Sequence, residues 1–73
     1  MRKDLTWDDA YDIGILLSGT HPEVEPLSLQ STDLQRYVTA LPDFKDDPAK
    51  ADDRKLEAIR LAWHDEFMDR TQG

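Results

Sequence analysis

The sequence predicts a small, mainly α-helical domain in which three helices pack on one another. Apolar residues recur at helical spacing in three separate stretches, and capping residues or prolines stand at the ends of these stretches. The length of 73 residues allows one domain over residues 1–73, with an ordered core from about 5 to 70. The chain has no cysteine, which excludes a disulfide framework.

The first helix is expected at about residues 8–18. Thr6 or Asp8 can cap it, and acidic residues at its start complement the helix dipole. Gly19 is expected to stop the helix, and Pro22 forbids its continuation. Its apolar face contains Trp7, Ala10, Gly14 and Leu17, flanked by Tyr11 and Ile13.

Residues 23–30 alternate apolar and polar positions around a proline, which predicts extended chain or one short edge strand at most. The second helix is capped by Ser31 or Thr32 and ends before Pro42. The third begins at Asp52 or Asp53 and runs to about residue 70. The apolar positions of these two helices are Leu34, Tyr37, Val38 and Leu41, then Leu56, Ile59, Trp63 and Phe67.

Each apolar stripe is narrow, so the three helices must bury their stripes against one another. This arrangement is compatible with a winged-helix topology, which is related to the helix-turn-helix. At most a minimal β-strand pair is expected, from residues near Leu5 or from residues 27–29.

The charge balance argues against a nucleic-acid partner. Nine Lys and Arg residues stand against sixteen Asp and Glu residues, giving a formal net charge of −7 that repels phosphate backbones. The longest apolar runs, such as residues 15–17, have three residues and are far too short to span a membrane, and a cytoplasmic location is expected. No nucleophile motif or glycine-rich phosphate loop is present, and His21 and His64 are interpreted as surface or boundary residues, so an enzyme is not expected.

Two acidic groups are the candidate sites. Residues 43–53 contain five aspartates but no glycine, which excludes an EF-hand and leaves loose oxygen ligands suited to weak binding of hard cations. The alternative is a solvated loop. Asp8, Asp9 and Asp12 share a side of the first helix with Ile15 and Leu16, a combination typical of a docking face. Here the alternatives are ordinary acid enrichment at a helix start and a core role for Leu16.

The order of several short motifs resembles the IscX (YfhJ) family of bacterial iron–sulfur cluster assembly proteins over about residues 5–67. These motifs are W-x-D followed by D-I-G at residues 7–14, Glu25-Pro26, Thr32-Asp33-Leu34, the D-F-x-D-D-P run at residues 43–48, and L-E-A-I-x-L-x-W at residues 56–63. Their order and spacing together carry the resemblance.

The resemblance implies a small acidic adaptor or regulator with a winged-helix-like fold, expected to be monomeric. It implies docking on the basic surface of a cysteine desulfurase, in competition with frataxin, and weak binding of Fe²⁺ or Fe³⁺ through exposed carboxylates. Two alternatives remain: an iron carrier or sensor that supplies the assembly machinery, and, less favoured because of the charge, a winged-helix DNA-binding protein.

The residues expected to contact the partner combine both acidic groups with the acidic end of the third helix: Asp8, Asp9, Asp12, Ile15, Asp43, Phe44, Asp46, Asp47, Asp65 and Glu66. The weak iron site is expected at Asp43, Asp46 and Asp47. Lys45 and Ile15 stand where the family commonly has acidic residues. Lys45 is expected to weaken the metal site, and Ile15 makes the helix face less negative and more favourable for apolar contact with a partner.

Overall fold

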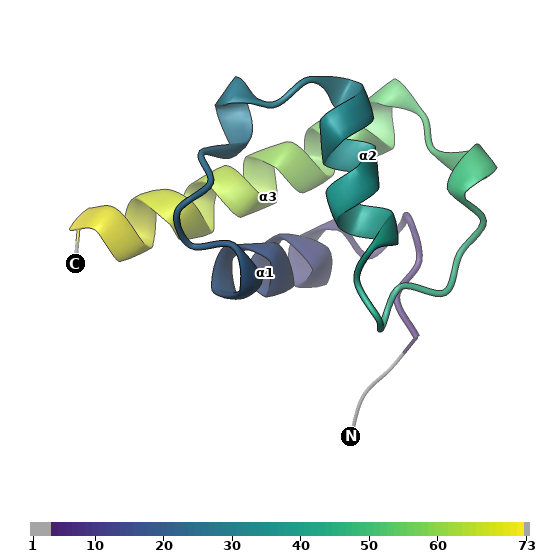
Figure 1. Cartoon of the computed structure of the whole chain (residues 1–73), viewed down its shortest axis with the longest axis horizontal. Helices are drawn as coiled ribbons and strands as arrows, with labels where there is room; N and C mark the ends of the chain where they lie inside the picture. The colour runs from purple at the N-terminus through teal and green to yellow at the C-terminus, as the bar shows by residue number, and fades with distance from the viewer. Residues whose placement is uncertain (1–3, 73) are drawn as a thin grey trace.

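The structure, a computed structural model, describes residues 4–72 and the side chains of residues 4–69. Three α-helices, α1 (Ala10–Thr20), α2 (Ser31–Thr39) and α3 (Asp53–Gln72), alternate with two single-turn 3₁₀ helices, η1 (Pro26–Ser28) and η2 (Pro48–Lys50). Figure 1 shows α1 alongside α3, with α2 steeply inclined to both. The predicted mainly α class is confirmed.

The core lies where the three helices meet the segments that precede α1 and follow α2. It contains Leu5, Trp7, Ile13, Leu17, Leu34, Val38, Leu41, Phe44, Leu56, Ile59 and Trp63. Most of the predicted apolar stripe positions are therefore buried. Ala10, Tyr37 and Phe67 are only half-buried, and Tyr11, expected beside the buried face, is 67% exposed.

Gly14 sets the closest approach between α1 and α3. A Cβ atom at this position would lie 2.6 Å from the Cβ of Ala62 and 2.8 Å from the main-chain nitrogen of Trp63. Because real Cβ contacts are not this short, any larger residue must push the two helices apart. The glycine in the D-I-G motif thus has a packing role.

Both ends of α1 differ from the prediction. The helix begins at Ala10 because the main-chain N–H of Asp9 donates to the carbonyl of Thr6, which closes a turn before the first helical residue. It continues through Gly19 to Thr20, and Gly19 does not have a positive φ. The predicted glycine stop is wrong, because the N–H of His21 still donates to the carbonyl of Leu17 and only Pro22 cannot continue the ladder.

The caps of the other helices are partly as predicted. Asp52 caps α3, with its carboxylate accepting the N–H of Lys55 at 2.8 Å. Helix α2 starts at Ser31 itself, and its N-cap residue Gln30 makes no side-chain cap hydrogen bond.

Residues 27–29, where at most a minimal strand was expected, form no strand, because Pro26 starts the 3₁₀ helix η1 there. Arg60 holds this turn against α3 by donating to the carbonyls of Pro26 and Leu29 at 2.8 and 2.6 Å. The other predicted β position takes part in one isolated parallel bridge between Leu5 and Phe44. Within the described residues this bridge forms no sheet, and a winged-helix likeness is not shown.

Candidate functional site

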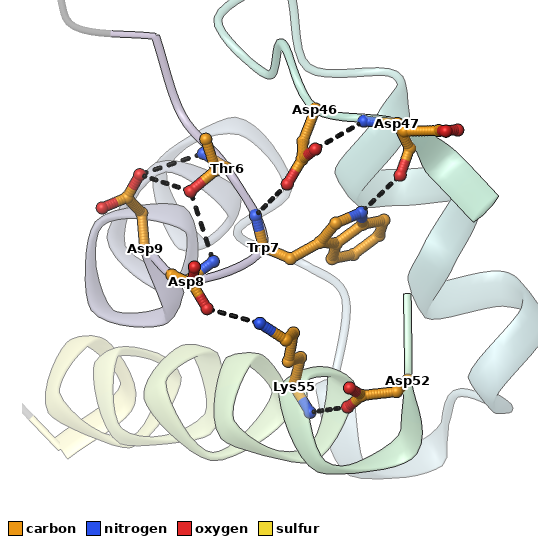
Figure 2. Close-up of polar contacts among 8 residues, drawn as sticks. All are labelled: Thr6, Trp7, Asp8, Asp9, Asp46, Asp47, Asp52 and Lys55. Atoms are coloured by element: carbon orange, nitrogen blue, oxygen red, sulfur yellow. Dashed lines mark hydrogen bonds and ion pairs between the residues drawn. The ribbon is translucent and has the colours of Figure 1, made fainter. Parts of the chain in front are cut away.

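Trp7 is the point at which the two acidic segments of the sequence meet. Its side chain is 1% exposed and packs edge-on against Phe44, with ring centroids 4.7 Å apart. Its indole Nε1–H donates to the main-chain carbonyl of Asp47 at 2.7 Å, and its main-chain N–H donates to the carboxylate of Asp46 at 3.2 Å. Figure 2 shows these contacts, which tie the entry to α1 to the loop of residues 43–47.

A main-chain bridge next to Trp7 makes the same connection. The N–H of Leu5 donates to the carbonyl of Asp43, and the N–H of Lys45 donates to the carbonyl of Leu5, both at 2.9 Å. Phe44 lies between these two contacts and is buried. The loop is thereby fixed on both sides of Phe44, so its aspartates are held in place by the fold.

Asp46 is the most constrained of these aspartates. One carboxylate oxygen accepts the N–H of Asp47 at 2.7 Å, and the other accepts the N–H of Trp7. These two hydrogen bonds hold the pKa of the Asp46 carboxyl below its usual value, so the group is ionised at neutral pH. Its neighbour Asp47 uses one oxygen to cap η2 by accepting the N–H of Ala49 at 2.9 Å.

The aspartates that precede α1 are held in different ways. The carboxylate of Asp9 accepts from the main-chain N–H of Thr6 at 2.9 Å and from its hydroxyl at 3.3 Å. Asp8 pairs with Lys55 of α3 (Figure 2), yet its side chain remains 79% exposed. The hydrogen bond to Asp8 raises the pKa of Lys55, so the Lys55 ammonium is charged at neutral pH.

These contacts join Asp8, Asp9, Asp43, Asp46 and Asp47 in one surface, and Asp12 is added to it because it lies three residues, about one helical turn, after Asp9. We call this set of six aspartates the Trp7 cluster. Asp12 lies in the first turn of α1, and its side chain is exposed like those of Asp8 and Asp47. Asp9, Asp43 and Asp46 are half-buried. The structure therefore brings together the two acidic groups that are about 30 residues apart in the sequence.

The other predicted contact residues do not all belong to this surface. Phe44 is 8% exposed, so it supports the loop from inside and offers little of its own surface to a partner. Ile15 is 37% exposed on α1. Asp65 and Glu66 lie on α3 about ten residues beyond Lys55, which corresponds to about 15 Å along the helix.

The three aspartates proposed for iron do not converge. Among the residues that the structure describes, no group of three or more His, Asp or Glu side chains is arranged to hold a metal ion. Both oxygens of Asp46 already accept main-chain N–H groups. The expected set Asp43, Asp46 and Asp47 therefore lacks the geometry of a coordination shell.

Sequence reasoning missed two residues that organise the cluster. Trp7 was predicted only as part of the apolar face of the first helix, and nothing in the sequence shows that it contacts the loop of residues 43–47. Lys55 was not singled out, because nothing in the sequence shows that it crosses from α3 to Asp8. Both act over separations of about 40 residues or more.

The fold and this surface define a class: a small acidic helical protein with a preformed carboxylate cluster. No helix in the described part of the chain is both long and apolar enough to cross a membrane. The family described as iron–sulphur cluster assembly, which is the IscX (YfhJ) family, matches residues 5–68. The chain belongs to this family and has a role in iron–sulphur cluster assembly.

A curated relative aligns with most of this chain. The uncharacterised protein PA3808 of Pseudomonas aeruginosa is 44% identical over 62 residues, which cover 85% of this chain and 94% of that protein. A similarity of this length includes the loop that carries Asp46 and Asp47 and most of the three-helix domain.

Proposed function

We propose that the chain is an adaptor or regulator that docks through the Trp7 cluster on the basic surface of a cysteine desulfurase, in competition with frataxin. The resemblance to IscX proteins supplies this partner, and the family match places the chain in the same process. The proposal is compatible with a net charge of −7 on an 8.4 kDa body, which steers it toward a cationic surface.

One observation carries the proposal: Trp7 joins the segment that contains Asp8 and Asp9 to the loop that contains Asp46 and Asp47. Carboxylates gathered from two segments present a broad acidic surface, where either segment alone would present a narrow one. A basic partner surface of ordinary interface size needs such a breadth of complementary charge.

The rigidity of the cluster supports binding as well. Asp46 is held by two main-chain N–H groups and Asp47 caps η2, so these side chains need little further ordering when a partner arrives. Side chains that are free before binding lose about 0.5–1.5 kcal/mol each on immobilisation. The preformed loop avoids part of that cost.

Charge reversal at exposed positions tests the proposal. In a titration against the cysteine desulfurase of the same organism, the double variant Asp12→Lys/Asp47→Lys is expected to bind at least about tenfold more weakly than wild type. The matched control is Glu23→Lys/Asp69→Lys, which makes the same change in net charge at exposed positions outside the cluster. Equal weakening by both variants would show that net charge, and not this surface, determines binding.

Iron binding is a separate proposal. Exposed carboxylates suit Fe²⁺ or Fe³⁺, and an iron carrier would show saturable binding that is lost when Asp43, Asp46 and Asp47 are replaced by asparagine. With Asp46 occupied by N–H groups, we expect only weak binding at these residues, without saturation at micromolar iron.

A further inference from the structure

A surface trough runs along α2, beside the Trp7 cluster. Two hollows, of about 540 and 320 Å³, share His21, Tyr37 and Ala40 in their walls, so they adjoin one another. The first reaches toward η1 at Leu29, and the second reaches the C-terminal end of α2 and the loop at Asp43. The volume of each hollow falls within or near the range of small-ligand sites, about 300–1,000 Å³.

The floor of this trough is aromatic and backed by the core. Tyr37 packs edge-on against His21, with ring centroids 4.7 Å apart, and against the buried ring of Trp63 at 5.7 Å. Tyr37 is half-buried, so it is held in position while still accessible. Rigid aromatic side chains with one accessible face are typical anchors of protein interfaces.

The walls combine apolar surface with one exposed cation. Leu16, Leu29 and Ala40 supply the apolar contacts. Arg36 lies on the rim, is exposed and makes no ion pair with the described residues, in a chain whose acidic residues outnumber its basic ones. Its guanidinium can donate several hydrogen bonds at once, which suits the carbonyl groups of an extended main chain.

We propose that this trough binds an extended, apolar segment of the same basic partner that docks on the Trp7 cluster. The inference rests on the proposed function. The trough is continuous with the cluster, because it ends at Asp43, whose main-chain carbonyl accepts the N–H of Leu5 in the bridge that anchors the acidic loop. A partner bound to the cluster therefore lies next to the open end of the trough.

The dimensions fit one short segment. Helix α2 has nine residues, which corresponds to a length of about 13 Å, and an extended chain covers that length with about four residues. Long-range attraction by net charge steers any basic protein toward the cluster, whereas an apolar side chain seated against Tyr37 adds discrimination by shape. The trough is thus the part of the surface that selects the partner.

Filling the trough tests this inference. Ala40 is exposed and lines both hollows, so Ala40→Trp blocks them where they meet. We expect this variant to bind the cysteine desulfurase about tenfold more weakly, by the same factor at low and at high salt, because the lost contacts are apolar. The control is Ala58→Trp, an equally large change at an exposed alanine of α3 outside both hollows. We expect it to bind like wild type.

The outcomes separate the two proposals. Wild-type affinity for Ala40→Trp, with weak binding by Asp12→Lys/Asp47→Lys, would overturn the trough and leave the docking cluster intact. Absence of binding by the wild-type chain would overturn both. If Ala40→Trp loses its helical circular dichroism, Arg36→Ala replaces it as the test. We expect this variant to bind about threefold more weakly, and unchanged affinity would overturn the inference.

Discussion

The indole nitrogen of Trp7 lies 2.7 Å from the main-chain carbonyl oxygen of Asp47, across a sequence separation of 40 residues. Through this hydrogen bond a buried core residue fixes the position of an exposed acidic loop. Core packing and the candidate docking surface are therefore coupled in this protein, and substitutions at Trp7 should affect both.

Trp7→Phe tests this coupling. The variant keeps an aromatic ring beside Phe44 but loses the donor to Asp47, and we expect a loss of about 1 kcal/mol in the free energy of unfolding beyond that of Trp63→Phe. The control is informative because the Nε1 of Trp63 is buried and has no hydrogen-bond partner among the described residues. Urea denaturation of the two variants gives the comparison. The coupling would be contradicted if Trp63→Phe lowered the free energy of unfolding as much as Trp7→Phe, or more.

The two glycines of α1 should respond in opposite directions to alanine. Gly14→Ala places a Cβ 2.6 Å from the Cβ of Ala62, and we expect a destabilisation of about 1–3 kcal/mol in spite of the better helix propensity of alanine. Gly19→Ala lies at an exposed helical position and should stabilise the protein by up to about 1 kcal/mol. Thermal denaturation of both variants measures the difference. A stabilising Gly14→Ala would show that α1 and α3 are farther apart than described.

The contribution of Asp46 to stability should depend on pH. Because its pKa is lowered in the folded state below the usual 3.8, its stabilising effect is present above pH 3.8 and disappears as the pH falls through the folded-state pKa. The free energy of unfolding of wild type should therefore exceed that of Asp46→Asn at pH 7, and the gap should close in acid. Glu23→Gln, at an exposed turn, serves as the control. A gap that stays constant down to pH 2 would contradict the assignment.

Lys55 should lower the affinity of the chain for the desulfurase. Its ion pair with Asp8 neutralises one carboxylate at the edge of the Trp7 cluster. We expect Lys55→Gln to bind the desulfurase about two- to threefold more tightly, with a steeper salt dependence, because Asp8 becomes available to the partner. Arg54→Gln removes the same charge from a neighbouring exposed position and should have a smaller effect. Weaker binding by Lys55→Gln would indicate that the pair is needed to shape the surface.

The helices could be predicted from the sequence because each one carries its own periodic apolar pattern. Leu34 and Val38 of α2 and Leu56, Ile59 and Trp63 of α3 are buried as their spacing predicts. The start of α1 and the turn at η1 were less predictable, because they depend on side-chain hydrogen bonds that no apolar pattern reveals. Asp9 bonds to Thr6 in one case, and Arg60 bonds to the carbonyls of Pro26 and Leu29 in the other.

The acidic residues of the candidate site could be predicted from the sequence, but the contacts that bring them together could not. Composition indicated an acidic surface, and the motifs indicated candidate aspartates in both segments, together with Asp65 and Glu66, which lie apart on α3. Two contacts of the site depend on tertiary structure: Asp46 accepts the N–H of Trp7, and Lys55 pairs with Asp8. Both require the packing of α1 against α3 and the bridge from Leu5 to Phe44. No local pattern encodes contacts at such separations.

The central claim is that the Trp7 cluster is the docking surface, and an amide NMR titration of the ¹⁵N-labelled chain with unlabelled cysteine desulfurase tests it most directly. The account predicts that the signals of residues 6–12 and 43–50, with the indole signal of Trp7 among them, are the first to shift or broaden. Perturbation confined to the C-terminal half of α3 around Asp65, with those signals unchanged, would contradict it.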